Sequence, residues 1–272
     1  MPDRADDVGW SWHDIWKAHG LAPHRWRQFK LSNDKAFAEK LHDVVGLYVS
    51  PPAQAIVLSL DEKSQIQALD RTQPGPPPNL PLKKGRGATS CWKHASSVMT
   101  HDYKRHGTTT LFAALNVLTG EVKGRTTARH RHQEFIAFLN IVERHAPADK
   151  DIHVILDNYA THKHAKVRDW LARHPRWTFH FTPTSSSWLN AVDLRRENGS
   201  PDRFLILLIF AKLTRRRLKH GVFRSVQDLE TAIANFLTHH NRSEAKPFTW
   251  TADPDKIIAA RNRGFHKLES IH

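Results

Sequence analysis

Cysteine, acidic residues and long apolar runs are all scarce in this 272-residue sequence. The single cysteine, Cys91, excludes an internal disulfide, which fits a reducing cytoplasm. The longest apolar run, 204–211, is far shorter than the roughly 20 residues that a membrane-spanning helix needs. The polar start of the chain also lacks a signal-peptide pattern. We therefore expect a cytoplasmic protein without a membrane span.

Basic residues outnumber the acidic ones. The chain has 41 Lys and Arg against 27 Asp and Glu, a formal net charge of +14 when histidine is neutral. This excess favours a polyanionic partner, most simply a nucleic acid. A purely architectural binder would share the charge, but it would not need buried strands that end in acids.

Two short apolar runs end in such acids: 56–60 precedes Asp61, and 152–156 precedes Asp157. Continuous apolar runs of this length are typical of strands buried on both faces. If the two strands are neighbours in one sheet, the carboxylates meet at one edge and repel each other unless a divalent cation, Mg²⁺ or Mn²⁺, lies between them. Taken alone, either Asp is more simply an ordinary turn residue at the end of a strand.

The other expected elements of this region alternate between strands and helices. They are a hairpin at 108–117 and 121–127, a helix at 133–145, a helix at 164–173 and a strand at 177–181, followed by a helix at 225–239. Together with the two acid-ended strands, this order predicts an α/β fold, a sheet with helices packed on it.

The first 50 residues are rich in tryptophan and are expected to be mainly helical. The expected elements are helices at 12–18 and 35–44 and a basic turn at 20–27. Two interpretations stay open: the tail of a helix-turn-helix region, or a helical arm packed on the main domain. Pro51-Pro52 marks the boundary, so we divide the chain into 1–50 and 51–272.

Basic residues gather in two places. The first group is Lys83, Lys84, Arg86, Lys93, Lys104 and Arg105, and the second is Arg215, Arg216, Arg217 and Lys219. A solvated loop explains the first group about as well as phosphate binding does. The second group lies in the strongest basic cluster of the chain and is the better candidate for holding phosphates. Two other chemistries lack support: zinc at His162 and His164 has no partner cysteines, and Cys91 has no defined base.

Four longer segments carry a family resemblance. They are 60–74 (LDEKSQIQALDRTQP), 101–108 (HDYKRHGT), 156–163 (LDNYATHK) and 181–190 (FTPTSSSWLN). In this order they resemble bacterial insertion-sequence transposases of the Tc/mariner superfamily. The resemblance implies a ribonuclease-H-like mixed sheet with flanking helices, preceded by a short helical remnant of a helix-turn-helix region. It also implies a D-D-E or D-D-D triad that holds two Mg²⁺ (or Mn²⁺) ions for cutting and joining double-stranded DNA at transposon ends and target, in a homodimer when active.

The resemblance makes Asp61 the first acid and Asp157 the second. Counting forward from Asn190 makes Asp193 the third, whereas counting back from Phe210 gives Leu207. Apparent insertions at 90–98 and about 194–207 interrupt the family pattern, and only the last part of the helix-turn-helix region is recognisable. We therefore expect a truncated or decayed transposase. The alternatives are a catalytically inactive DNA-binding remnant and a metal-dependent DNA nuclease.

Overall fold

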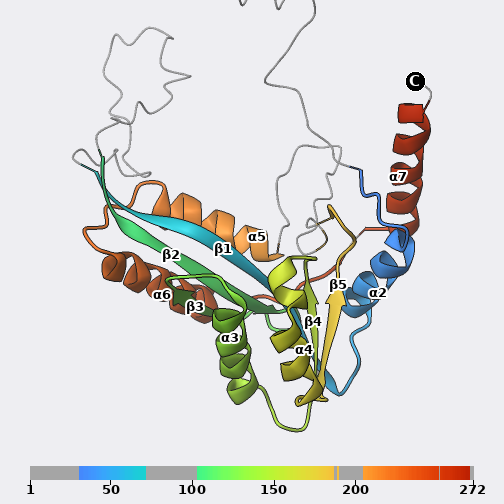
Figure 1. Cartoon of the computed structure of the whole chain (residues 1–272), viewed down its shortest axis with the longest axis horizontal. Coiled ribbons are helices and arrows are strands. Elements are labelled where there is room, and N and C mark those ends of the chain that lie inside the picture. Colours follow the sequence, from blue (N-terminus) through green and yellow to red (C-terminus); the bar gives the residue numbers. More distant parts are fainter. Residues whose placement is uncertain (1–30, 72–102, 187–188, 190–204, 251, 270–272) are drawn as a thin grey trace, which may run out of the picture. The chain divides into compact units, whose positions relative to one another are not determined.

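Five strands form one mixed sheet in the order β3-β2-β1-β4-β5 (Figure 1). The computed structural model describes residues 31–71, 103–186, 189, 205–250 and 252–269. The strands are β1 (Ala55–Arg71), β2 (Tyr103–Asn116), β3 (Val122–Thr127), β4 (Asp151–Leu156) and β5 (Trp177–Phe181). β1, β2 and β3 pair antiparallel, whereas β1, β4 and β5 pair parallel. This confirms the ribonuclease-H-like mixed sheet.

The helices fall mostly where the sequence predicts them. They are α2 (Phe37–Val49), α3 (His132–His145), α4 (Ala165–Ala172), α5 (Leu205–Leu213), α6 (Val226–Ser243) and α7 (Pro254–Glu269), with a short 3₁₀ turn η3 (Ala160–Lys163) and a π-helical turn η5 (Thr214–Leu218). Of these helices, α5 and α7 have no counterpart among the helices that the sequence predicts. Among the described residues, no helix is both long and apolar enough to cross a membrane.

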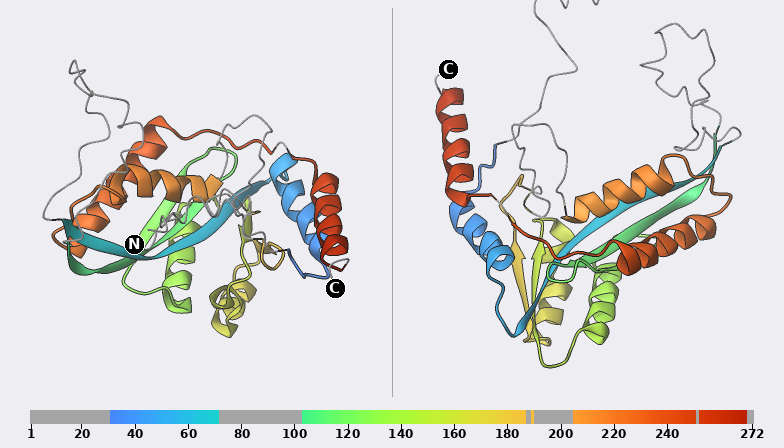
Figure 2. Two further views of the ribbon diagram at one scale, coloured as in Figure 1. Left: turned by 90° about the horizontal axis from the view of Figure 1, so that it is seen from above. Right: turned by 180° about the vertical axis from the view of Figure 1, so that it is seen from behind.

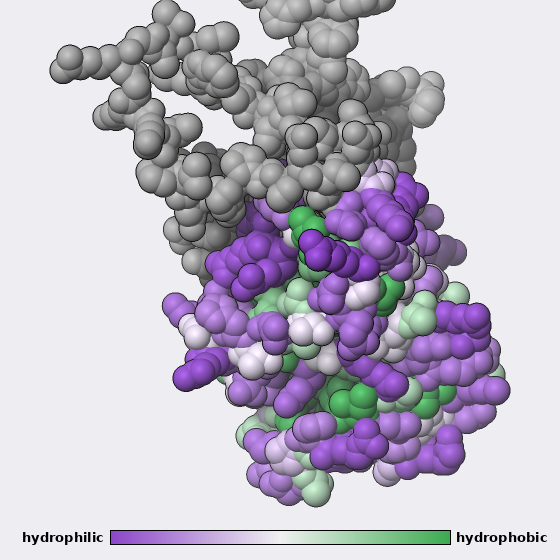
Figure 3. All heavy atoms as spheres, turned by 90° about the vertical axis from the view of Figure 1, so that its left-hand side faces the viewer, coloured by the Kyte–Doolittle hydropathy of each residue, from purple (hydrophilic) through white to green (hydrophobic). Residues whose placement is uncertain are grey.

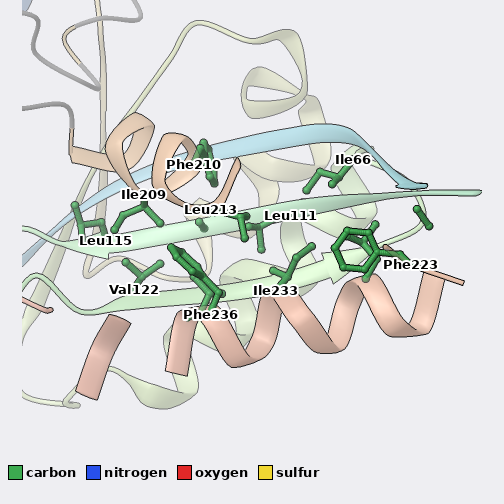
Figure 4. Close-up of a cluster of buried hydrophobic side chains, with 14 residues drawn as sticks. Ile66, Leu111, Leu115, Val122, Ile209, Phe210, Leu213, Phe223, Ile233 and Phe236 are labelled. Carbon is green, nitrogen blue, oxygen red and sulfur yellow. The ribbon is translucent and has the colours of Figure 1, made fainter. Parts of the chain in front are cut away.

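Helices cover both faces of the sheet (Figure 2). Because side chains alternate along a strand, Leu111 and Phe112 of β2 point to opposite faces. Phe112 lies in a cluster with α3, α4, β1, β4 and β5, while Leu111 lies in a cluster with α5 and α6. Figure 4 shows the second cluster, with Phe210 of α5 and Phe236 of α6 directed at the strands. The sheet is therefore the middle layer of three.

A third cluster lies beside β1 and β4, where α2 packs. Its buried residues include Tyr48 of α2, Val57 of β1 and Ile155 of β4. Residues 32–272 form one compact unit, to which α2 belongs. The first expected helix, at 12–18, lies outside the described residues.

β1 is much longer than its parallel neighbour β4. It runs through the polar residues after Leu60 and continues to Arg71, paired only with β2 in this second part. The pairing of β1 with β2 shifts between Lys63 and Ile66, and Gln65 there has a φ of 54°. An irregularity of this kind bends a strand and increases its twist. β1 thus joins the centre of the sheet to a two-stranded extension.

Candidate functional site

The pairing of β1 with β4 brings Asp61 and Asp157 to the same level of the sheet. The residue pairs of β1 and β4 run from Ala55 with Asp151 to Ser59 with Ile155, a constant offset of 96 residues (151 − 55 = 155 − 59 = 96). Asp61 and Asp157 differ by the same number (157 − 61 = 96). Asp61 lies within β1, and Asp157 directly follows β4. The two acids therefore belong to neighbouring parallel strands at one height.

The environment of Asp61 disfavours its negative charge. Burial, and then the nearby carboxylates of Glu62 and Asp157, raise the pKa of Asp61 to about 7. The backbone N–H of Glu62, which donates to Asp61 Oδ1 at 2.8 Å, and His162 oppose this shift only in part. A buried carboxylate beside other carboxylates is stabilised by a bound cation, so the donor set suits a hard divalent ion.

Asp157 lies in a different environment. Burial alone would raise its pKa, but His162 and the backbone N–H of Tyr159, which donates to Oδ1 at 3.0 Å, lower it below the ordinary value. Asp157 is therefore held as a carboxylate at neutral pH. Two acids with opposite pKa shifts at one sheet edge are typical of functional sites.

Sequence reasoning missed the role of His162 in this cluster. Its side chain is 1% exposed, with Nδ1 3.2 Å from Asp157 Oδ1 and Nε2 3.3 Å from Glu62 Oε2. Burial lowers the pKa of His162, but the neighbouring carboxylates of Asp157 and Glu62 outweigh this and raise the pKa to about 9. Nδ1 is also hydrogen-bonded to the Asp157 carbonyl at 3.2 Å, whereas Nε2 and Glu62 Oε2 have no hydrogen-bond partner among the described residues. The only signal in the sequence was its place five residues after Asp157, and the chain has 20 histidines.

The loop that follows β4 is fixed to β5. Asn158 donates from Nδ2 to the carbonyl of Thr182 at 2.5 Å, and Lys163 donates to Asn158 Oδ1 at 2.5 Å. The backbone N–H of Thr182 also donates to the carbonyl of Leu156. Asp157 therefore lies between two residues, Leu156 and Asn158, that are each hydrogen-bonded to Thr182.

The third expected acid, Asp193, lies outside the described residues, as does the start of the apparent insertion at 194–207. The nearest described residue before it is Leu189, which is fully buried and packs in the cluster of Val57 and Ile155. Tyr48 donates its hydroxyl to the Leu189 carbonyl at 3.4 Å. Within the described ranges, no three side chains of the metal-binding types form a group that could hold an ion.

Part of the expected DNA-binding set can be located. Lys104 and Arg105 are exposed at the start of β2, and Arg215, Arg216, Arg217 and Lys219 are exposed in and just after η5. Arg216 forms an ion pair with Glu244, which Lys212 also contacts at 3.2 Å. Lys83, Lys84 and Arg86, and the insertion at 90–98, lie outside the described residues.

The start of β2 lies well away from the acids along the sheet. Arg105 pairs with Leu69, and the carbonyl of Leu69 also accepts from the N–H of Phe223. Leu69 is eight residues beyond Asp61 (69 − 61 = 8), or about 26 Å along an extended strand.

Hydrophilic residues cover most of the described surface on the side of the molecule shown in Figure 3.

Comparison with known proteins gives one family. Residues 88–195 match the family described as DDE superfamily endonuclease, a segment that contains Asp157 and Asp193, whereas Asp61 precedes it. No curated protein matches the chain.

Among solved structures, the chain is similar to the Mos1 strand transfer complex, with 14% identity over 94% of this chain and 65% of that chain and a TM-score of 0.43. It is also similar to a pre-cleavage Mos1 transpososome, with 13% identity over 92% and 69% of the two chains and a TM-score of 0.46. A mariner Mos1 paired-end complex with Mg gives 12% identity, coverage of 87% and 70%, and a TM-score of 0.37. The chain thus spans about two thirds of the length of these structures.

Proposed function

We propose that the chain is a DNA transposase that cuts and joins DNA strands with divalent metal ions, and the match of residues 88–195 to the family described as DDE superfamily endonuclease supports this. The observation that carries the proposal is the placement of Asp61 and Asp157 at one height on neighbouring parallel strands. Burial of Asp61 beside other carboxylates supports the same reading, because such a group is stabilised by a cation.

In this proposal Asp61, Asp157 and Asp193 hold the metal. Two Mg²⁺ or Mn²⁺ ions bound there would supply the activation of a water or a DNA 3′-hydroxyl and the stabilisation of the leaving oxygen. Support for Asp193 comes from Leu189, which is anchored in the cluster of Val57 and Ile155. Four residue steps separate Leu189 from Asp193, a reach of at most about 14 Å. The chain can therefore bring the third carboxylate to the edge where the other two lie.

We further propose double-stranded DNA as the partner and a homodimer as the active form. The net charge of +14 supplies attraction for phosphates. Lys104 and Arg105 lie about 26 Å from Asp61 along β1 and β2, which is the length of about eight base pairs at 3.4 Å each. A duplex that is cut at the acids can therefore reach the basic end of β2. Arg215 and Arg217 are further candidates for phosphate contacts, while Arg216 pairs with Glu244.

Nicking of supercoiled plasmid tests the function. We expect the wild-type chain to nick DNA with Mg²⁺ or Mn²⁺ but not with EDTA. Asp61→Asn and Asp157→Asn should each slow nicking by at least about 100-fold, because each removes part of a metal site that contributes several kcal/mol. Asp169→Asn, at an exposed acid on α4, is the matched control and should nick normally.

Three outcomes separate the candidate functions. Joining of a labelled 3′-hydroxyl end to plasmid supports a transposase, while nicking without joining supports a metal-dependent nuclease. Salt-dependent DNA binding without any nicking supports an inactive DNA-binding remnant.

Changing Lys104 and Arg105 together to Ala tests their proposed phosphate contacts. The slope of log affinity against log salt concentration should become shallower by about two, because two phosphate contacts are lost. An unchanged slope contradicts their role.

A further inference from the structure

The backbone ladder between β1 and β4 ends before it reaches the two acids. The last pair is Ser59 with Ile155, two residues short of Asp61 and Asp157. Each acid is fixed instead to the strand on its other side. Asp61 pairs with Ala113 of β2, and the carbonyl just before Asp157 accepts from the N–H of a residue after β5. The ladder between β1 and β4 therefore does not pair the two acids directly with each other.

A buried imidazole lies between β1 and the segment after β4. His162 Nδ1 lies 3.2 Å from Asp157 Oδ1, and His162 Nε2 lies 3.3 Å from Glu62 Oε2. Glu62 belongs to β1 and directly follows Asp61, so the two ring nitrogens reach from the β4 side to the β1 side. The Glu62 side chain is 12% exposed, which leaves its carboxylate little access to water.

The ring is also held in orientation by its neighbours. The ring of Phe135 lies 4.7 Å from the imidazole centroid, and the ring of Tyr159 meets it edge-on at 5.9 Å. Phe135 is fully buried on α3, so the imidazole is backed by the core. A ring packed in this way stays between the two carboxylates, with its Nε2 close to Glu62 Oε2 but not hydrogen-bonded to it.

We propose that His162 is a positioning residue that links β1 to the segment after β4 beyond their last backbone pair and thereby fixes the spacing of Asp61 and Asp157. The inference rests on the proposed function, because the spacing matters only if the two acids share a metal site. His162 acts through Asp157 and Glu62 and does not itself touch the substrate. Groups that orient metal ligands in this way typically contribute 10- to 100-fold in metal affinity, and a misplacement of about 1 Å costs about 100-fold in rate.

Mn²⁺ binding to the full chain without DNA tests the proposal. Binding is measured by electron paramagnetic resonance as the loss of the signal of free Mn²⁺. We expect His162→Ala to bind Mn²⁺ about 10- to 100-fold more weakly than wild type. The key variant is His162→Asn, whose amide keeps a donor near the position of Nδ1 but cannot reach Glu62. It should bind as weakly as His162→Ala, because the link to β1 is lost in both.

His240→Ala is the matched control. His240 is also a buried histidine, with Nε2 3.1 Å from the Gly120 carbonyl, and it contacts none of the acids of the site. It should lose thermal stability while its Mn²⁺ affinity stays within about twofold of wild type. Glu62→Gln, which changes no volume, tests the other end of the bridge if the His162 variants fail to fold, and it should also weaken Mn²⁺ binding.

Two results overturn the positioning role. The first is wild-type Mn²⁺ affinity in His162→Asn or, where the His162 variants do not fold, in Glu62→Gln. The second is an equal loss in His240→Ala, which means that affinity only follows stability. Asp61→Asn and Asp157→Asn keep this separate from the proposed function. If they bind Mn²⁺ like wild type, the metal site itself is wrong; if they lose binding while the variants at 162 do not, only the bridge is wrong.

Discussion

Replacing Leu189 by Ala separates the support of the third acid from the general stability of the fold. Leu189 is fully buried in one cluster with Val57 and Ile155, which lie four residues before Asp61 and two residues before Asp157 (61 − 57 = 4; 157 − 155 = 2). Its carbonyl accepts from Tyr48 and its N–H donates to the Ser186 carbonyl at 2.8 Å. Under the proposed function, this anchor keeps Asp193 within reach of the metal.

The stability change follows from the burial. Truncating a fully buried Leu to Ala leaves a cavity and costs about 3 kcal/mol in the free energy of unfolding. For a unit of this size, such a loss lowers the melting temperature by about 6–12 °C. Leu139 of α3 is equally buried but lies in the cluster on the opposite face of the sheet, so Leu139→Ala should lose a similar amount.

Metal affinity should distinguish the two variants. We expect Leu189→Ala to bind Mn²⁺ at least about tenfold more weakly, which corresponds to about 1.4 kcal/mol. Leu139→Ala should bind like wild type at a temperature where both variants are folded. The measurements are thermal unfolding by circular dichroism and Mn²⁺ titration at 15 °C below the lower melting point. Equal Mn²⁺ affinities in the two variants refute the idea that Leu189 supports the metal site.

Two further predictions concern other parts of the chain. The ion pair with Lys40 lowers the pKa of Asp34 to about 2, so Asp34 stabilises the fold above about pH 4 and this contribution is lost as the pH falls towards 2. Between pH 5.5 and 3, urea unfolding should therefore show that the free energy of unfolding falls by about 1–2 kcal/mol less in Asp34→Asn than in wild type. The same fall in both proteins argues against this role of Asp34. Deleting 194–207 together with Asp193→Glu joins the acid directly to α5 and should raise metal-dependent nicking at least about tenfold, because the acid is then anchored on both sides. A repaired protein that folds, binds DNA and nicks no faster contradicts this.

The sheet and its two acids could be predicted because their signals are local. The apolar runs before Asp61 and Asp157 specify buried strands, and buried neighbours in an α/β sheet are commonly parallel. The equal offset then follows from pairing alone. β1 continues past Asp61 through several polar residues to Arg71. They are tolerated there because β4 has already ended and β1 pairs only with β2.

The rest of the site could not be read from the sequence because it depends on contacts distant in the chain. His162 meets Glu62 across 100 residues (162 − 62 = 100), and only the folded chain brings them to 3.3 Å. Histidine is common in this sequence, so its type gave no signal. The basic residues show the same limit: composition predicted a polyanionic partner, but not that Arg216 is already paired with Glu244.

β1 connects the proposed chemistry to the proposed grip on DNA. Asp61 lies where β1 still neighbours β4, and Leu69 lies where β1 pairs with Arg105 of β2. A hydrogen-bonded pair of strands is much stiffer than a loop, and the bulge at Gln65 sets its direction. Under the proposed function, strand length therefore sets the spacing of about eight base pairs between the cut and the basic residues. The sequence of the DNA in between need not be read for this spacing to hold.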